Sequence, residues 1–463
     1  MIHCYKHCGH NIILDVASGS IHSVDAVTYD VVRLYELVLD GKEPQVLIKR
    51  ILELHPNVTE SDIRAIIIDI EMLRNRGKLF TADDYNISVG ANCVRPHKEQ
   101  APLTAVCLNV SHVCNMTCAY CFAGQGEYND GENSNDTKLM SFETGKKAVD
   151  FLIRSSGTKR NLDIDFFGGE PLLNLQVVKE IVAYAREVEK KLDKKIRFTL
   201  TTNGLLIDDE VISFANKEFH NVVLSLDGRP ETHDAMRKIT GKASSYDEVL
   251  PKIKKLVEAR RYKGYYIRGT FTRENMDFTN DILHLADLGF TELSLEPAVT
   301  KKDDPLGFTK NDLPELYRQY DMLAIEMQRR KLLGRGFNFY HYTLDITDGP
   351  CIHKRIAGCG VGVDYMAVTP AGDLYPCHQF VGDKRFLLGN VHSGAVNNKQ
   401  RDEFAAVSIY SRSECRECWA RFYCSGGCAA NAYYASGSIN GIYEIGCELF
   451  KRRIENAIML QVV

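Results

Sequence analysis

Hydrophobic and polar positions change their period along the chain. In the first 80 residues, two short β-rich runs, NIILDV and SIHSV, are separated by ASG, which is typical of a hairpin. Apolar residues then recur at helical spacing over about 26–39, over about 43–54, and from Thr59 to a stop at Gly77. The pattern predicts a hairpin on three helices, a winged-helix-like domain spanning 1–82. The polar, aperiodic residues 83–102 suit a linker.

From about 104 to 300, apolar strands alternate with helical patterns. The predicted strands are TAVCLNVS, LDIDFFGG, IRFTLTTNG, NVVLSLDG, YYIRGTFT and TELSLEPA. The predicted helices lie near 141–155, 176–192, 208–218, 246–262 and 277–289. Six such units with continuous apolar strands predict a parallel α/β sheet, either doubly wound or curled into a barrel. The polar segments GGEP, TTNG and SLDG follow successive strands, at the edge where such folds place their chemistry.

The remaining residues form two further segments. Residues 309–344 contain one helical pattern near 310–331 and are interpreted as a helical bridge. Residues 345–463 show little periodicity and many cysteines, which predicts a domain built around bound metal.

Composition narrows the class of protein. At 463 residues, with 44% apolar and 25% charged residues, the chain reads as a soluble protein of two or three domains. The formal net charge of −4 gives no electrostatic case for nucleic acid or an anionic membrane surface as a partner. The N-terminal residues lack a signal-peptide core, and no window approaches a membrane span, so we expect a cytoplasmic protein.

The fifteen cysteines are the anomaly in this composition. In a reducing cytosol, clustered cysteines indicate metal or redox sites before disulfides. No cysteine lies between Cys121 and Cys351, and eight lie from Cys351 onward. This distribution favours two metal-binding regions around a cysteine-free body. We interpret Cys4, Cys8, Cys93 and Cys107 as structural or incidental.

The first cysteine group follows the first predicted strand as Cys114-x3-Cys118-x2-Cys121. A zinc site would need a fourth ligand, which His112 is placed to supply. A [4Fe–4S] cluster would instead use three thiolates and leave one iron open to an added ligand.

With Tyr120 before its last cysteine, this group resembles the signature of the radical S-adenosylmethionine superfamily, and GGEP stands at the second strand end as in that superfamily. The resemblance implies a partial (β/α)6 TIM-like barrel over 103–308 and S-adenosylmethionine bound to the open iron. GGEP would contact its amino group, and Ser225 with Arg237 would hold its carboxylate, for which an arginine is suited. The residues implied to bind this cofactor are Tyr120, Gly168, Gly169, Glu170, Ser225, Arg237 and Glu296.

The C-terminal cysteines are similar to the SPASM extension of radical S-adenosylmethionine enzymes, which carries two auxiliary iron–sulfur clusters. CRECWARFYCSGGC places them at a spacing that two zinc knuckles would not have. The resemblance implies that one cluster binds Cys415, Cys418, Cys424 and Cys447. It implies that the other binds Cys359, Cys377 and Cys428, with Cys351 a possible fourth ligand. Three [4Fe–4S] clusters are therefore expected. If Cys351 does not bind, an open iron could capture a substrate thiolate.

The N-terminal domain has two interpretations, DNA binding and peptide binding. Residues 1–80 contain nine Lys or Arg against eleven Asp or Glu, so the basic face that DNA binding needs is missing. Peptide binding would add an extended segment to the hairpin edge. Over its full length the chain resembles the six-cysteine (SCIFF) peptide maturases, which join cysteine sulfur to backbone carbons of a small precursor. The resemblance implies a cysteine-rich precursor peptide, with its leader on the N-terminal domain, and a low-potential electron donor of flavodoxin or ferredoxin type.

Other functions on this scaffold stay open. Sulfatase maturases carry an aspartate base after the second auxiliary cysteine, where this chain has His378, and that departure argues against sulfatase maturation. His378 is a candidate proton acceptor or hydrogen-bonding residue. Carbon–carbon cross-linking and epimerisation of peptides are enzymatic alternatives. An iron–sulfur electron carrier or a zinc-stabilised regulator is the non-enzymatic one.

Overall fold

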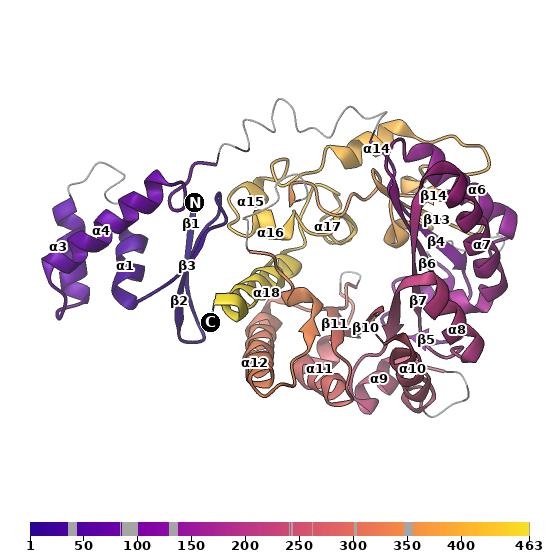
Figure 1. The fold of residues 1–463 in the computed structure, drawn as a ribbon, viewed down its shortest axis with the longest axis horizontal. Helices are drawn as coiled ribbons and strands as arrows, with labels where there is room; N and C mark the ends of the chain where they lie inside the picture. The colour runs from indigo at the N-terminus through magenta and orange to yellow at the C-terminus, as the bar shows by residue number, and fades with distance from the viewer. Residues whose placement is uncertain are drawn as a thin grey trace.

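The computed structural model describes residues 1–35, 44–83, 85, 101–128, 138–239, 241, 244–261, 263–300, 303–346 and 355–462. It contains an N-terminal module, a curved central sheet with helices on its outer side, and a cysteine-rich C-terminal region between the two (Figure 1). Within these ranges, no helix has the length and apolar character needed to cross a membrane. Most of the predicted linker 83–102 lies outside the described residues.

The N-terminal module is a three-stranded antiparallel sheet followed by helices. Its elements are β1 (Ile2–His7), β2 (His10–Asp15), β3 (Ile21–Val24), α1 (Ala26–Leu34), α3 (Pro44–Leu54) and α4 (Glu60–Asn75). The hairpin of β2 and β3 and the three helices match the predicted elements, although residues 36–43 lie outside the described part of the chain. The sequence analysis missed β1, which pairs with β2 along its full length. The winged-helix assignment stays a prediction.

The central sheet contains the six predicted strands, all parallel. They are β4 (Ala105–Ser111), β6 (Asn161–Gly168), β7 (Lys195–Thr202), β8 (Phe219–Ser225), β10 (Gly264–Phe271) and β11 (Glu292–Pro297). They adjoin one another in chain order, as repeated β/α units require. Their carboxyl ends therefore meet at one edge, which brings the segments after β4, β6, β7 and β8 together.

Short strands extend this sheet at both sides to ten strands. They are β12 (Asn338–Phe339), β13 (Tyr365–Val368), β14 (Asp373–Tyr375) and β15 (Gly389–Asn390). β12 pairs parallel to β11, so the predicted bridge 309–344 contributes a strand as well as a helix. β13 pairs parallel to β4, and β14 and β15 continue as an antiparallel meander. The C-terminal region is thereby part of the same sheet.

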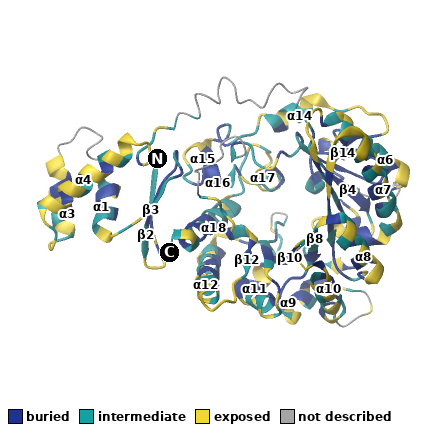
Figure 2. Cartoon of the chain, viewed as in Figure 1, coloured by how far each residue is buried: buried dark blue, intermediate teal, exposed yellow. Residues whose placement is uncertain are grey.

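Helices cover the outer side of the sheet and expose their polar faces (Figure 2). They are α6 (Phe142–Ser155), α7 (Leu175–Leu192), α8 (Asp209–Glu218), α9 (Pro230–Met236), α10 (Tyr246–Arg260), α11 (Phe278–Asp287) and α12 (Leu313–Leu332). Ser141 and Asp208 cap α6 and α8 through side-chain oxygens that accept backbone N–H groups. Leu108, Ile164 and Leu200 of the strands are buried against these helices, and this burial is the main favourable term in holding the two layers together.

The C-terminal region ends in a long helix that links all parts of the molecule. Its helices are α14 (Asn398–Ala405), α15 (Ser413–Arg416), α16 (Arg421–Cys424), α17 (Ala429–Ser436) and α18 (Glu444–Val462). Arg452 of α18 pairs with Asp321 of α12 at 2.5 Å. One turn further along α18, His7 of β1 contacts Asn456 with 2.9 Å between Nε2 and Oδ1, and Asn456 Nδ2 donates to the same Asp321 at 3.1 Å. The N-terminal sheet is thus packed on the C-terminal region.

Candidate functional site

The loop after β4 brings three cysteines together. The pKa of Cys118 is raised to about 11, first by burial and also by the neighbouring Cys114 and Cys121 sulfur atoms. A short antiparallel ribbon, β5 (Thr117–Cys118) with β9 (Arg237–Lys238), fixes the middle cysteine. The three predicted ligands therefore face one another within one loop at the carboxyl edge of the sheet.

The GGE turn after β6 is seated directly on this cysteine loop. Gly169 N–H donates to Ser111 O at 2.7 Å, and Glu170 N–H donates to Val113 O at 2.9 Å. A Cβ on Gly168, whose φ is +135°, would lie 2.2 Å from Ser111 O, and one on Gly169 would lie 2.4 Å from Val113 O. Only glycine permits this close approach of two backbones.

Glu170 is fully buried and serves as an acceptor for its neighbours. Its carboxylate accepts from Leu172 N–H at 3.0 Å, from the Thr202 hydroxyl at 2.8 Å and from Asn203 N–H at 2.8 Å. Burial raises its pKa to about 7, and these hydrogen bonds oppose the shift. The Glu170 carboxyl group is therefore held in place by three hydrogen bonds, and it gains or loses its proton close to neutral pH.

Asn203, in the TTNG segment after β7, contacts the cysteine loop. Its Nδ2 lies 3.8 Å from Cys114 Sγ and donates to Asn115 Oδ1 at 2.7 Å. The sequence analysis gave Asn203 no role, and its position at a strand end was the only available signal. An N–H directed at a sulfur ligand is one of the interactions that tune an iron–sulfur centre.

Arg237 lies beneath the same loop and is held by three groups. Its Nε pairs with the buried Asp227 at 3.0 Å, and its Nη1 lies 3.9 Å from Cys118 Sγ. Its guanidinium also lies 5.5 Å from the Tyr120 ring centroid. The Tyr120 hydroxyl donates to Asp227 Oδ2 at 2.5 Å. Asp227, which the sequence analysis did not select, is the common partner of two predicted cofactor-binding residues.

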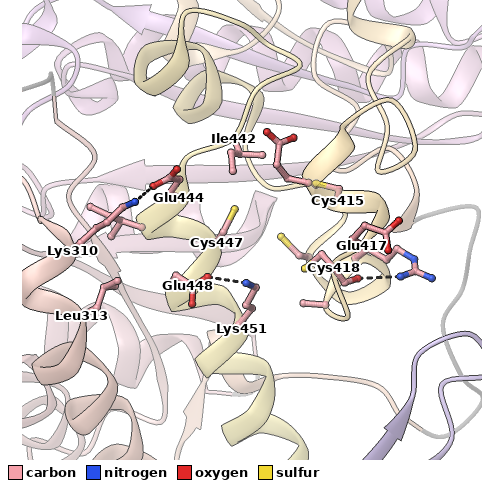
Figure 3. Close-up of a pocket in the computed structure, with 16 residues that line it drawn as sticks. Lys310, Leu313, Cys415, Glu417, Cys418, Ile442, Glu444, Cys447, Glu448 and Lys451 are labelled. Atoms are coloured by element: carbon pink, nitrogen blue, oxygen red, sulfur yellow. Dashed lines mark hydrogen bonds and ion pairs between the residues drawn. The ribbon is translucent and has the colours of Figure 1, made fainter. Parts of the chain in front are cut away.

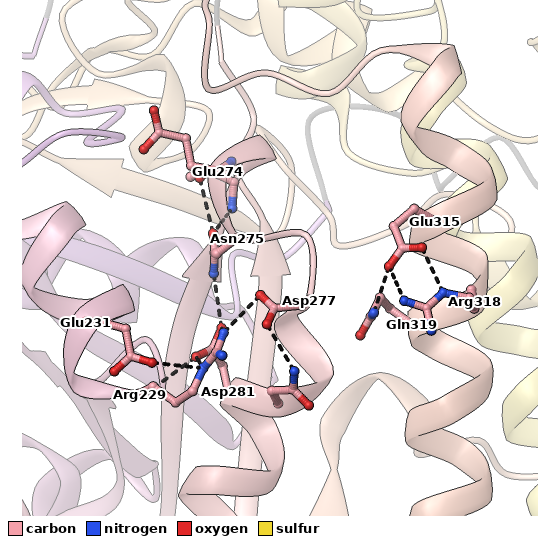
Figure 4. A network of polar contacts seen from close by, with 11 residues as sticks. Arg229, Glu231, Glu274, Asn275, Asp277, Asp281, Glu315, Arg318 and Gln319 are labelled. Carbon is pink, nitrogen blue, oxygen red and sulfur yellow. Dashed lines mark hydrogen bonds and ion pairs between the residues drawn. The ribbon is translucent and has the colours of Figure 1, made fainter.

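A polar network fixes the segment after β8 that carries Asp227 (Figure 4). Arg229 Nε donates to Asp281 Oδ1 at 2.8 Å, and Arg229 Nη2 donates to Asp277 Oδ1 at 2.9 Å. Asn275 donates to the other Asp281 oxygen at 3.3 Å. Asp281 is fully buried, so the network ties this segment to α11. Ser225, the last residue of β8 directly before this segment, is half-buried.

Four cysteines of the C-terminal region surround one cavity. Cys415, Cys418 and Cys424 come from the loop that contains α15 and α16, and Cys447 approaches from α18 (Figure 3). The cavity measures about 500 Å³, and all four cysteines line it. Burial raises the pKa of Cys424 to about 12, and Cys447, Cys415 and Cys418 each contribute to the shift.

Three further cysteines form another group. Burial raises the pKa of Cys377, and the sulfur atoms of Cys428 and Cys359 raise it further. Gln379 Nε2 lies 3.9 Å from Cys428 Sγ. Cys351, the possible fourth member, lies outside the described residues, as does Cys93. Ten cysteines therefore lie in three groups of neighbours with the membership that the resemblance implied, and their roles as cluster ligands stay a prediction.

Comparison with known families agrees with this arrangement. A model of the radical SAM superfamily matches residues 108–286, and a model of the SPASM iron–sulfur cluster-binding domain matches residues 359–419. The chain carries a radical SAM domain and a SPASM domain. The matched ranges contain the cysteine loop, the segments after β6, β7 and β8, and the first four SPASM cysteines.

Similar proteins have diverse names. The radical SAM cyclopropyl synthase TigE of Paramaledivibacter caminithermalis is 24% identical over 374 residues, 77% of this chain and 74% of TigE. A cysteine-type anaerobic sulfatase-maturating enzyme of Clostridium novyi is 24% identical over 363 residues, 74% of this chain and 92% of that enzyme. The structure of SuiB from Streptococcus suis bound to its precursor peptide SuiA has a TM-score of 0.53 and 14% identity, covering 95% of this chain and 97% of SuiB. At that identity the likeness shows a shared fold alone.

The residues of both domains fit the cofactors that the domains imply, [4Fe–4S] clusters and S-adenosylmethionine. Thiolates are the ligands that such clusters use, and the glycine turn packs its backbone directly against the radical SAM loop. Among the described His, Cys, Asp and Glu side chains, no three converge as the ligands of one ion would. Such spacing is compatible with a four-iron cluster, where each thiolate binds a different iron.

His378 lies between the two domains. It follows Cys377 of the SPASM domain, and its ring centroid lies 5.5 Å from that of Phe122, just after the radical SAM cysteines, and 5.0 Å from that of Phe167. Its Nδ1 contacts the Tyr365 hydroxyl at 3.4 Å. Burial, followed by the charge of Arg268, lowers the pKa of His378 to about 4. The ring is therefore neutral at pH 7.

Glu296 lies near the carboxyl end of β11, apart from the cysteine loop contacts described above. Its carboxylate pairs with Arg268 of β10 at 3.7 Å, and both side chains are more than a third exposed. Its predicted contact with S-adenosylmethionine stays a prediction.

Proposed function

We propose that this chain is a radical SAM peptide maturase. It would abstract a hydrogen atom from a ribosomally made, cysteine-rich precursor peptide and form thioether cross-links between cysteine sulfur and backbone carbons. One cavity supports this assignment: about 670 Å³ in volume, it is lined by Glu296 at the barrel edge and by Cys359 and Cys428 of the SPASM domain. A peptide in this cavity would lie between the barrel edge and sulfur ligands. The fold shared with SuiB, a protein crystallised with a precursor peptide, favours a peptide as the substrate class.

The N-terminal module is the proposed leader-binding site. In the described part of the chain, β3 pairs only with β2, so its other edge is available to an extended peptide. The module is not basic, and nucleic acid is therefore a poor candidate partner. Because β1 packs on α18, a leader on this sheet would be tethered close to the SPASM domain.

The chain's residues would divide the work as follows. When bound to the first cysteine group, S-adenosylmethionine would supply a 5′-deoxyadenosyl radical. Glu170 would hold its amino group, and Arg237, steadied by Asp227, would lie near its carboxylate. Phe122, Phe167 and neutral His378 would form an apolar wall that excludes water from the reacting centre. The ten described cysteines, with Cys351, would hold three [4Fe–4S] clusters, served by a flavodoxin- or ferredoxin-type donor.

The first test counts cofactors. Anaerobically reconstituted wild type should contain about twelve iron atoms per chain, and a Cys114/Cys118/Cys121→Ala variant about eight. Only the wild type should release 5′-deoxyadenosine with dithionite. The control is Cys8→Ala, which removes an exposed cysteine from the N-terminal module and should change neither quantity. Zinc in place of iron, with S-adenosylmethionine left intact, would disprove the proposal.

A second test identifies the reaction. Each thioether that forms lowers the mass of a cysteine-rich precursor by two hydrogen atoms. It also leaves one cysteine fewer that an alkylating agent can modify. Carbon–carbon cross-links give the same mass change but leave the thiols free, and epimerisation leaves the mass unchanged. Formylglycine formation on a sulfatase peptide would favour sulfatase maturation instead.

A further inference from the structure

Arg453 of α18 lines the 670 Å³ cavity that lies between the barrel edge and the SPASM cysteines. Arg453 is buried, with only 8% of the residue exposed to solvent. Its Nε and Nη2 donate to the Tyr320 hydroxyl at 2.9 and 2.7 Å, and its Nη1 lies 3.4 Å from His341 Nδ1. A guanidinium has five N–H groups, so two of them have no partner among the described residues.

The partners of Arg453 are neutral, so its charge is not balanced locally. Burial raises the pKa of the Tyr320 hydroxyl, while burial and then the Arg453 charge hold the pKa of His341 well below its usual value. Among the described residues, no carboxylate lies within ion-pair distance of Arg453. A buried cation without a counter-charge is costly, and proteins normally provide one.

The charged side chains near Arg453 have ion-pair partners, so the lack of one among the described residues distinguishes Arg453 from its neighbours. Arg452, the preceding residue, pairs with Asp321 at 2.5 Å and with Glu455 at 2.8 Å. Glu296, which also lines the cavity and raises the pKa of the nearby Tyr320, is paired with Arg268 of the adjacent strand at 3.7 Å. The carboxylates near Arg453 are therefore already paired with other arginines.

A second polar group in the same cavity also lacks a partner. Asn431 of α17 lines the cavity, and its Oδ1 is buried and accepts no hydrogen bond from the described residues. A buried amide oxygen without a donor costs free energy unless a ligand or water supplies one. The cavity thus offers a cation and an acceptor to one entering molecule.

We propose that Arg453 binds a carboxylate of the substrate peptide while Asn431 accepts one of its N–H groups. The inference rests on the proposed function, which makes the substrate a peptide, and it adds the feature by which the cavity selects among peptides. The carboxylate is either an acidic side chain or the C-terminal group of the peptide. A planar guanidinium binds either one in the same two-pronged geometry.

The test measures the binding of three N-acetylated peptide probes to the anaerobic holoenzyme by titration calorimetry. The probes are acetyl-Gly-Ala-Cys-Gly-Ala-Glu-amide, the same peptide with Gln in place of Glu, and the Gln peptide with a free C-terminal carboxylate. Wild type should bind at least one of the two carboxylate peptides about tenfold more tightly than the Gln amide. Whichever carboxylate peptide gains affinity identifies the source of the group.

Variants separate this site from other roles of the helix. Arg453→Met should abolish the preference for the carboxylate peptides, and Arg453→Lys should retain part of it. Arg452→Met, a matched removal of a paired arginine, should leave the preference intact, with iron content checked for every variant. Equal affinity for all three probes, no measurable binding, or an unchanged preference in Arg453→Met would overturn the proposal. A shift in cluster potential without a change in preference would also overturn it, since Arg453 would then balance the charge of the clusters.

The result of the calorimetry does not depend on which reaction the enzyme carries out. Mass spectrometry of a cysteine-rich precursor reports whether thioethers form, whereas calorimetry reports only the recognition of carboxylates. A carboxylate preference in an enzyme that forms no thioether would retain the site and refute the proposed function. Thioether formation without a carboxylate preference would support the proposed function and refute the Arg453 site.

Discussion

Arg237 and Asp227 form a buried ion pair beneath the radical SAM cysteines, with 3.0 Å between Nε and Oδ1. Asp227 lies two residues before the N-cap of α9, Arg237 is the C-cap of that helix, and Arg237 belongs to the ribbon that fixes Cys118. Asp227 also accepts from Tyr120 and from Thr270 N–H at 3.0 Å. The pair therefore connects the cysteine loop, the segment after β8 and strand β10.

Removing one partner should be more harmful than removing both. Asp227→Asn leaves a buried guanidinium without its counter-charge, which typically costs about 3–5 kcal/mol. We expect Asp227→Asn and Arg237→Met each to lower the midpoint of guanidinium unfolding of the iron-free protein, followed by circular dichroism. The double variant should lose less than either single variant. Strictly additive losses would show that the two side chains do not interact.

Binding of S-adenosylmethionine should depend on the charge of Glu170. Its pKa of about 7 lies above the unfolded value of about 4.3. For a carboxyl group shifted upward, the stabilising contribution is present below the unfolded pKa and is lost as the pH rises through 7. The charged form, which can hold an ammonium group, accumulates over the same pH interval.

We therefore expect wild-type affinity for S-adenosylmethionine to rise with pH between 6 and 8, by about fivefold from 6 to 7 and about twofold from 7 to 8. Glu170→Gln should bind weakly throughout this range. Taking the ratio of the two affinities at each pH cancels the titration of the ligand's own amino group. A flat ratio, measured by anaerobic equilibrium dialysis, would contradict a role for the Glu170 charge.

The strands and the cysteine groups could be predicted because each depends on local sequence. A nearly continuous apolar run such as that of β4, whose residues from Val106 to Ser111 are all buried, specifies a strand buried on both faces. The cysteine spacing is a ligand pattern that needs no tertiary information. Both were read from the sequence without knowing where α18 would place Cys447, 19 residues beyond Cys428.

Features that depend on distant partners could not be predicted. β1 is a short alternating strand whose inner residues contact α18 more than 440 positions away. β12 and β15 have two residues each and exist only because a neighbouring strand pairs with them. Nothing in the sequence distinguished Asp227 from other acidic residues, because its importance comes from its contacts with Tyr120 and Arg237 in the folded chain.

His378 should not act as the principal base of the reaction. A pKa of about 4 keeps its ring neutral at neutral pH and makes it a weak proton acceptor. We expect His378→Gln to keep 5′-deoxyadenosine formation and to form peptide product within about tenfold of wild type, because loss of a general base costs about 10²–10⁴. The pH profile of product formation should have the same shape in both proteins. A 100-fold loss confined to product formation would assign the base role to His378.

The N-terminal module, with Asp83 directly after it, should protect the auxiliary group of Cys415, Cys418, Cys424 and Cys447 from oxygen. The side chain of Arg421, between Cys418 and Cys424 in the sequence, is almost fully buried and pairs with Asp83 at 2.6 Å. The His3 ring stacks on the Trp419 ring, with 3.8 Å between the two ring centroids. These contacts place the N-terminal module over the loop that carries the ligands. A cluster whose surroundings open to solvent changes its potential and its access to oxidants.

Loosening this contact should therefore expose the cluster without removing a ligand. We expect Arg421→Gln and Trp419→Ala, measured after full anaerobic reconstitution, to lose iron–sulfur absorbance in air severalfold faster than wild type. Arg64→Gln, on the exposed face of α4 and paired only within that module, is the matched control and should bleach at the wild-type rate. Equal bleaching of all four proteins would mean that the N-terminal module gives the cluster no protection.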